Sequence, residues 1–403
     1  MAVVLGLSGE AGAVAPLGAA KRVDKDTGTS DVYWFNTNFR VTRTGTGGFA
    51  VAWEENTVSE SPNPIIWEDV RFRVFNGSFA PVAAPKAANL AGNKRLPNLV
   101  NIVPLGASNA YLVYALTRDN NNIDHPEIRE AFGQAIALAT GAATGARKLL
   151  NPPATGIWDT LTGIASGLSN GRAVFAWYES DEFAPAPGRF ISSAGAPMAA
   201  NLDFACCSDP AQLTGLFPLA NGSFVASYRR NSIFGGKNGL HGRVFKSNGQ
   251  PLGPAKYLTT STANPSIRTL SNGRIAVFTF VPVGNPVTHS KLVVQVYDKN
   301  WAKVGGKKTL IPNVTSTKFL DLEPTLDGGM FMVRTILQGT NVYKRSIRRL
   351  DANFAPDGPD YTFSSPHGFD AFRVAALSVN RAVVLFRNIV GGRHQLFVRI
   401  LSY

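Results

Sequence analysis

Cysteine is nearly absent from this chain of 403 residues, which contains only Cys206 and Cys207. Two adjacent cysteines cannot form a disulfide framework. They could form a strained ring or a crosslink to another subunit, but two reduced thiols are the simpler interpretation. Long apolar runs are also missing, and the N-terminal segment has no basic residue before its short apolar stretch. We therefore expect neither a membrane span nor a Sec signal peptide.

Acidic residues are scarce as well, because 27 Asp and Glu face 40 Lys and Arg and leave a net charge of +13. The chain instead has 39 glycines and 25 prolines, an above-average share that excludes a helical bundle. Apolar residues make up 44% of the sequence, which is enough for a large core.

A repeat runs through most of the chain. Its signature is Leu-x-x-Gly followed by alternating apolar residues, found at residues 168–171, 219–222, 270–273, 326–329 and, with Asn in place of Gly, 377–380. Two degenerate copies begin at Thr44 and Leu105. Seven copies with a period of about 50 residues are typical of propeller blades.

Each repeat predicts four short antiparallel strands. After the first turn, alternation such as Phe49/Val51/Trp53 puts three side chains on one face of a strand. The Asn-Gly or Gly-Gly before that strand favours a two-residue hairpin turn. Third strands are expected at residues 70–75, 240–245, 292–297, 346–350 and 396–401, and fourth segments at 79–82, 250–253, 301–304 and 354–357.

The last repeat has no fourth segment after its third strand, whereas residues 12–22 parallel the fourth segment of another repeat at 250–256. We therefore predict an all-β fold, a seven-bladed β-propeller of four-stranded antiparallel blades in a single domain of residues 1–403. Residues 1–24 would supply the closing strand to the blade formed by 366–403. A string of small β-sandwiches is the alternative, but each would need its own core within about 50 residues.

The segment Gly47-Gly-Phe-Ala-Val-Ala-Trp53 resembles the Gly-Gly-Phe-x-Val-x-Trp repeats of large bacterial surface and secreted proteins. This resemblance covers the repeat pattern through most of the chain and implies a surface or secreted protein. The motif itself is mainly structural.

Residue patterns that carry catalysis or metal binding are missing. The five histidines, His125, His241, His289, His367 and His394, form no ligand pair, and no nucleophile elbow or phosphate loop is present. Acidic loops at 24–31 and 119–124 offer oxygens for calcium, but solvated turns are the simpler interpretation. We predict no cofactor, no metal and no catalytic residues, so the protein is not expected to be an enzyme.

The positive charge is concentrated in one part of the chain. Residues 221–310 hold 13 basic residues and one acidic residue, Asp298, whereas residues 151–220 hold 2 and 6. In a propeller, consecutive segments are adjacent sectors, so a basic flank should lie beside an acidic one. The candidate contact residues are Arg229, Arg230, Lys237, Arg243, Lys246, Lys256, Arg268, Arg274, Lys291, Lys299, Lys303, Lys307 and Lys308.

These features favour a non-catalytic structural or binding module of a larger assembly, either a phage virion component or a bacterial surface protein exported without a Sec signal. Its partners would be other protein subunits or an anionic polysaccharide. Stacking aromatics are sparse, with Phe234, Tyr257 and Trp301 as the exposed candidates, which argues against sequence-specific nucleic acid binding. The alternatives are a lectin-like propeller using Trp34 or Trp67 and, less favoured, a glycan hydrolase or lyase.

Overall fold

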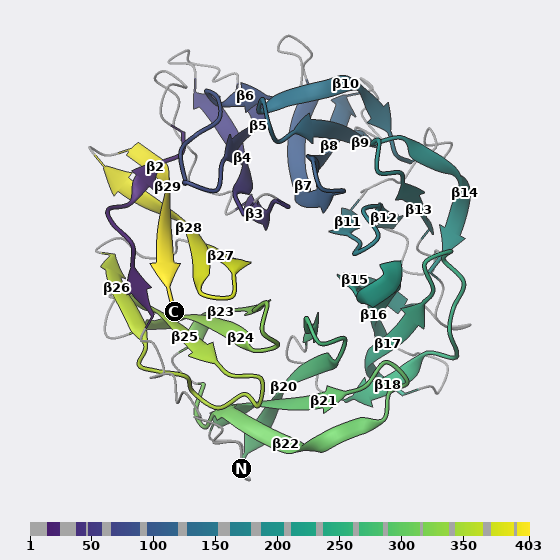
Figure 1. Cartoon of the computed structure of the whole chain (residues 1–403). Helices are drawn as coiled ribbons and strands as arrows, with labels where there is room; N and C mark the ends of the chain where they lie inside the picture. The colour runs from purple at the N-terminus through teal and green to yellow at the C-terminus, as the bar shows by residue number, and fades with distance from the viewer. Residues whose placement is uncertain are drawn as a thin grey trace, which may run out of the picture.

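The computed structural model describes residues 14–24, 38–45, 47–58, 66–88, 95–119, 127–151, 162–178, 187–204, 211–230, 237–260, 266–284, 289–314, 317–337, 343–365, 372–390 and 393–403. These residues form seven antiparallel sheets, arranged as a ring around a central axis (Figure 1). The predicted all-β, seven-bladed propeller is confirmed. Blades are numbered 1 to 7 in the chain order of their inner strands.

The strand bounds follow the same order in every blade, from the centre of the ring outward. The inner strands are β3 (Phe39–Arg43), β7 (Arg95–Leu105), β11 (Thr162–Gly167), β15 (Ala211–Pro218), β19 (Ser266–Thr269), β23 (Thr317–Pro324) and β27 (Phe372–Ser378). The second strands are β4 (Phe49–Val58), β8 (Asn109–Asp119), β12 (Ala173–Tyr178), β16 (Phe224–Arg230), β20 (Ile275–Val283), β24 (Met330–Leu337) and β28 (Arg381–Val390).

The third strands are β5 (Ile66–Phe75), β9 (Glu127–Ala137), β13 (Pro187–Ile191), β17 (Gly239–Phe245), β21 (His289–Tyr297), β25 (Tyr343–Leu350) and β29 (Arg393–Ser402). The outer strands are β6 (Lys86–Ala87), β10 (Ala142–Leu149), β14 (Pro197–Asp203), β18 (Lys256–Thr259), β22 (Lys303–Ile311), β26 (Tyr361–Ser365) and, in blade 7, β1 (Ala15–Pro16) with β2 (Lys21–Arg22). A short 3₁₀ turn, Ala220–Gly222, precedes β16.

The N-terminal segment closes the ring by pairing with the last strand of the chain. Ala15 of β1 lies opposite Ser402, and Lys21 of β2 lies opposite Val398, both antiparallel. The side chain of Val14 is buried between blades 6 and 7, and that of Val23 is buried between blades 7 and 1. The closing segment therefore contributes apolar contacts at both seams of blade 7 as well as backbone hydrogen bonds.

The buried apolar side chains of the described residues form seven clusters, one at each interface between neighbouring blades. Alternation along the second strands explains this arrangement. Phe49, Val51 and Trp53 face blade 7, whereas Ala50 and Ala52 face blade 2. Each sheet thus buries both faces and is stable only between two neighbours.

The first hairpins differ in detail from the expected two-residue turns. In blade 3 the N–H of Leu168 donates to the carbonyl of Arg172 (2.7 Å), which leaves three residues in the loop. The last of these, Gly171, has φ of 80°, a conformation that only glycine adopts without steric cost. The two-residue prediction is therefore wrong here, because the left-handed glycine closes a longer hairpin.

Blade 6 shifts the repeat by one residue. Its left-handed glycine is Gly328 (φ 91°), whereas the sequence pattern placed it at Gly329. Gly329 is needed for a different reason, because a Cβ there would lie 2.3 Å from the carbonyl oxygen of Leu350. Two adjacent glycines thus serve the turn and the close approach of strands, and Gly47 with Gly48 do the same in blade 1.

The turns between third and outer strands contain an unusual backbone conformation. Phe79, Trp301 and Phe354 have φ of 61° to 65°, which is costly for an aromatic residue. Glycine occupies the equivalent position in blades 3 and 4, at Gly195 and Gly249. Each aromatic ring packs against an interblade cluster, so burial offsets the backbone cost. The outer strands begin a few residues after three of the four predicted segments, at Lys86, Lys256 and Tyr361.

Removing residues 1–24 should destabilise the ring, because it deletes the β1 and β2 pairings and the buried Val14 and Val23. Burial of the two side chains alone is worth about 3–6 kcal/mol. Thermal unfolding followed by circular dichroism should show a lower Tm, and size-exclusion chromatography should show association through the exposed β29 edge. Leu17→Ala, at an exposed side chain of the same segment, is the control and should keep the Tm near that of the native protein. An unchanged Tm after the deletion would contradict the closure.

Phe354→Gly should be more stable than Phe354→Ala, by about 1 kcal/mol. Both variants lose the buried ring, but only alanine retains the penalty of a left-handed backbone. Chemical denaturation of both proteins measures the difference. Phe331, a buried residue of β24 outside the positive-φ group, is the control. There the order should reverse, with glycine less stable than alanine, and the same order at both positions would contradict the strain argument.

Candidate functional site

Twelve of the thirteen predicted contact residues lie on the second to outer strands and turns of blades 4 and 5. Arg229, Arg230, Arg243 and Lys291 are half-buried, and Lys237 and Arg274 are exposed. The other six are exposed lysines of the outer strands β18 and β22 and of the turns before them. We call these six the lysine surface: Lys246, Lys256, Lys299, Lys303, Lys307 and Lys308.

Within the described part of the chain, no residue of the lysine surface forms an ion pair with a carboxylate. Asp298, the one acidic residue of this stretch, is used by its own turn. Its carboxylate accepts the backbone N–H groups of Asn300 and Ala302, both at 2.8 Å. Within the described residues, the positive charge of the lysine surface is therefore not neutralised by a carboxylate.

The outer strand of blade 5 also exposes its backbone. Eight of the nine residues of β22 are exposed or half-buried, and a Cβ added to Gly305 or Gly306 would meet no atom within 4 Å. Beside these glycines lies a cavity of about 140 Å³ at the junction of blades 5 and 6. Arg274 and Lys308 line it together with Asn353 and Phe354. The cavity thus combines two cationic side chains with an aromatic wall.

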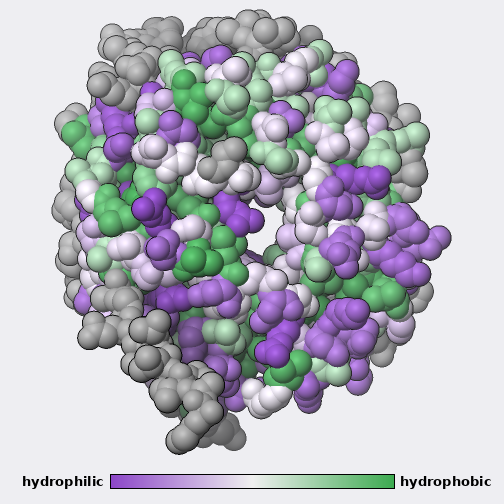
Figure 2. All heavy atoms as spheres, in the orientation of Figure 1, coloured by the Kyte–Doolittle hydropathy of each residue, from purple (hydrophilic) through white to green (hydrophobic). Residues whose placement is uncertain are grey.

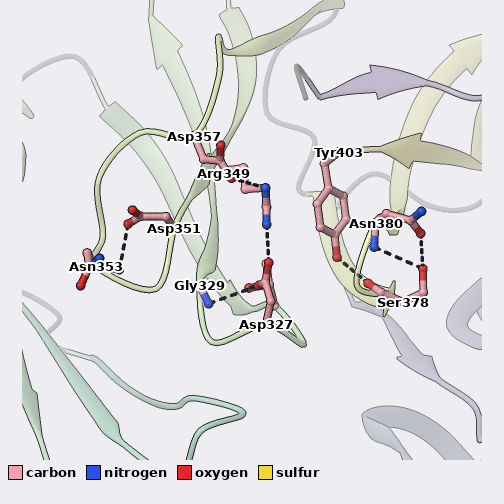
Figure 3. Close-up of polar contacts among 10 residues, drawn as sticks. Asp327, Gly329, Arg349, Asp351, Asn353, Asp357, Ser378, Asn380 and Tyr403 are labelled. Carbon is pink, nitrogen blue, oxygen red and sulfur yellow. Dashed lines mark hydrogen bonds and ion pairs between the residues drawn. The ribbon is translucent and has the colours of Figure 1, made fainter. Parts of the chain in front are cut away.

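The wall that blade 6 contributes to this cavity is held by side-chain hydrogen bonds (Figure 3). The carboxylate of Asp351 accepts the backbone N–H groups of Asn353 and Ala355, both at 2.8 Å. Figure 3 shows Arg349 between Asp327 and Asp357, with an ion pair to each. These contacts fix the conformation of the turn that carries Asn353 and Phe354.

Arg268 is separate from the other predicted contact residues because it lies on the inner strand β19. Its Nε donates to the carbonyl of Leu322 in blade 6 (2.6 Å), and its Nη2 contacts Asp321 (3.4 Å). It therefore joins two of the inner strands that surround the central channel. Figure 2 shows an opening at the centre of the ring with hydrophilic residues beside it.

Charged side chains on inner strands of different blades influence one another electrostatically. Arg40, Asp321 and Arg373 each lie three residue pairs before the last regular pair of their hairpin, so they stand at one level in blades 1, 6 and 7. Arg40 interacts electrostatically with Asp321 although blade 7 separates their blades. Arg43 of blade 1 likewise interacts with Glu323 of blade 6.

Burial and neighbouring charges shift the pKa values of two charged residues on the inner strands. Burial, reinforced by the charge of Asp321, raises the pKa of Glu323 to about 8. Burial, reinforced by Arg373, lowers the pKa of Arg40 to about 10. Sequence reasoning missed these residues because they are separated by hundreds of positions and share no motif. The one signal was a polar residue recurring in the first strand of several repeats.

Several predicted candidates lie outside the described residues, namely Cys206, Cys207, Trp34, Phe234, His125, His367 and most of the two acidic loops. Of the six acidic residues at 151–220, only Asp203 is described, so the acidic flank stays a prediction. His241 is buried, and its Nδ1 lies 3.2 Å from the carbonyl of Gly239. Tyr257 and Trp301 are half-buried and not exposed, since each packs against another ring.

Among the described side chains, no group of three His, Cys, Asp or Glu comes together in a way that could hold a metal ion. No helix in the described ranges is long and apolar enough to cross a membrane.

Comparison with known proteins gives similarity of fold. No protein-family model matches the chain, and no curated protein matches its sequence. An ulvan lyase of a polysaccharide lyase family is 11% identical, with a TM-score of 0.52 over 95% of this chain and 96% of that one. The polysaccharide lyase Uly1 is 9% identical, with a TM-score of 0.51 over 90% and 89%. The sialidase NanB from Streptococcus pneumoniae is 9% identical, with a TM-score of 0.46 over 95% and 70%.

The raised pKa of Glu323 predicts a pH-dependent penalty on stability. Its pKa is about 8 when folded, against 4.5 as the ordinary value, so between these limits the folded state binds more protons than the unfolded state. Stability should therefore fall as the pH rises from about 4.5 to about 8. Glu323→Gln should remove this dependence, and its Tm should exceed that of the native protein most clearly above pH 8.

Thermal unfolding of both proteins between pH 4 and pH 9 measures the effect. Asp327→Asn is the control with the opposite sign. Burial opposes ionisation of Asp327, but hydrogen bonds from Thr325 and the charge of Arg349 together lower its pKa. Its replacement should cost stability at neutral pH and little at low pH. A constant Tm difference for Glu323→Gln across the range would contradict a titrating channel carboxyl.

Proposed function

We propose that this propeller is a binding module of a larger assembly that contacts an anionic polysaccharide through the lysine surface of blades 4 and 5. The observation that carries this proposal is the row of exposed lysines on β18, β22 and their turns, none of which has a carboxylate partner within the described residues. Unneutralised charges of one sign attract a polyanion and give it a fast, salt-dependent association.

The extent of the lysine surface favours a polymer over a small anion. The nine residues of β22 span roughly 30 Å at the rise of an extended strand, and β18 of the adjacent blade continues the charge along the rim. A single small anion could occupy only one or two lysines. A chain with repeated acidic groups could contact several lysines at once, and these weak contacts would add up.

Polysaccharide is favoured over nucleic acid because the nearby aromatic rings are engaged. Tyr257 packs against His241 and lies beneath the Lys237 ammonium, and Trp301 packs on Tyr297. Neither ring is presented for base stacking. Two of the propellers with a similar fold are polysaccharide lyases. The cavity beside Arg274 and Lys308 would accept one acidic sugar ring at the edge of this surface.

A glycan-cleaving enzyme is the second candidate, since Glu323 and Asp321 stand beside Arg268 in the channel. A carboxyl group with a pKa near neutrality suits general acid or base catalysis. We favour the binding module because these carboxylates are tied into contacts between blades and lie away from the lysine surface. An acidic protein subunit could occupy the same lysines in place of a polysaccharide.

The lysine surface should bind dextran sulfate and alginate but not uncharged dextran, and the affinity should fall steeply with added salt. Lys303→Glu with Lys307→Glu should weaken binding by about tenfold or more, since each change reverses a contact charge. Isothermal titration calorimetry at two ionic strengths measures both effects. Lys148→Glu, an exposed lysine on the outer strand of blade 2, is the matched control and should bind as the native protein does.

Equal binding by the double variant and the native protein would rule out the lysine surface as the contact. Release of new reducing ends from either polysaccharide, abolished by Glu323→Gln, would instead favour the enzyme.

A further inference from the structure

The cavity at the junction of blades 5 and 6 lies beside a bulge in β22. Residues 305–307 stand opposite Gln295 of β21 alone, so the outer strand departs from its partner at this point. Gly305 has φ of 70°, the left-handed conformation that glycine adopts without steric cost. The side chain of Gln295 is buried, and its Nε2 donates to the carbonyl of Gly305 (3.1 Å). A buried side chain therefore holds the bulge in place.

The lining of this cavity has an apolar part and a cationic part. Val294 and Phe354 belong to the buried cluster between blades 5 and 6, and the half-buried Val296 packs against it. Two exposed cations, Arg274 and Lys308, complete the contrast. The cavity volume of about 140 Å³ is close to the roughly 150 Å³ of an apolar cavity that admits benzene. The space therefore suits one six-membered ring.

Neither cation of the cavity is neutralised by a carboxylate within the described residues. The backbone N–H of Arg274 donates to Oδ1 of Asn272 (3.1 Å), but its guanidinium forms no hydrogen bond or ion pair in the described part of the chain. The Nζ of Lys308 donates to the backbone carbonyl of Asn353, which is a neutral group. Both positive charges are therefore retained beside an apolar surface.

We propose that this cavity is a subsite for one uronate ring of the bound polymer, an assignment that rests on the proposed polysaccharide contact. A uronate ring carries a single carboxylate attached directly to a ring carbon. The carboxylate can therefore meet Arg274 and Lys308 while an uncharged face of the ring covers the apolar residues. The planar guanidinium of Arg274 matches the two oxygens of a carboxylate.

The same lining disfavours a heavily sulfated sugar. A ring with more than one sulfate group would place a second charge over Val294 or Val296, where burial of an unpaired charge is costly. The lysine surface does not make this distinction, because ammonium groups attract any polyanion as point charges. The subsite thus gives the protein a preference for polymers of uronic acids over sulfated polymers.

Isothermal titration calorimetry of the full chain can compare an alginate tetrasaccharide with a dextran sulfate oligosaccharide of the same net charge. We expect the alginate tetrasaccharide to bind more tightly. Arg274→Gln should weaken its binding by about tenfold, the usual effect of losing a charged hydrogen-bond donor. Binding of the dextran sulfate oligosaccharide should weaken by less than about threefold. Arg274→Lys keeps the charge but loses the planar donor pair, so it should bind the tetrasaccharide with intermediate affinity.

Arg172→Gln is the matched control. Arg172 follows the same Leu-Ser-Asn-Gly turn in blade 3, and its N–H donates to the side chain of Asn170 (3.2 Å) as that of Arg274 does to Asn272. This variant should bind both oligosaccharides as the native protein does. Arg274→Gln should keep the native Tm, because the guanidinium has no bond to lose within the described residues.

Equal affinity of the native protein for the two oligosaccharides, or an equal loss of both in Arg274→Gln, would overturn the uronate subsite. A large loss of Tm in that variant would also overturn it, because Arg274 would then serve the fold.

The lysine surface is tested separately by Lys303→Glu with Lys307→Glu, which should weaken binding of both oligosaccharides. If this double variant binds both as the native protein does while Arg274→Gln loses the tetrasaccharide, the lysine surface fails as the contact and the subsite is supported.

Discussion

Closure of the ring by pairing of β1 and β2 with β29 is the interaction on which the rest of the structure depends. Every apolar cluster of the described residues lies between two sheets, so a blade without both neighbours would expose a hydrophobic face. The seam between blades 7 and 1 is reinforced by a side chain as well, since Arg73 of blade 1 donates to the carbonyl of Val23 (2.8 Å).

Much of this architecture could be predicted from residue patterns because propeller blades are local in sequence. Alternating apolar residues identified the second strands, and the likeness of residues 12–22 to another fourth segment identified the closing strand. The errors came where two residues could serve one role. In blade 6 either Gly328 or Gly329 fits the pattern, and only the clash of a Cβ with Leu350 assigns each glycine its place.

The lysine surface and the charged residues of the inner strands differ in how well they could be predicted from the sequence. The lysine surface could be predicted because its charges lie within 90 consecutive residues, which the fold places in adjacent blades. The charged residues of the inner strands could not be predicted, because Arg40 and Arg373 belong to the first and the last blade, which become neighbours only when the ring closes. The composition of one segment does not show which residues of distant blades will come close. In a repeat protein, charges on the outer strands can therefore be predicted from consecutive residues, whereas contacts around the central axis cannot.

The pairing of Ala15 with Ser402 also constrains how the chain reaches its native state. During synthesis β1 leaves the ribosome long before its partner β29, because Ser402 follows Ala15 by 387 residues. Until then, blade 1 and the incomplete ring keep apolar faces open to solvent and to other chains. A contact that spans nearly the whole sequence forms slowly, so the final and slowest step of folding is expected to be the docking of the N-terminal segment.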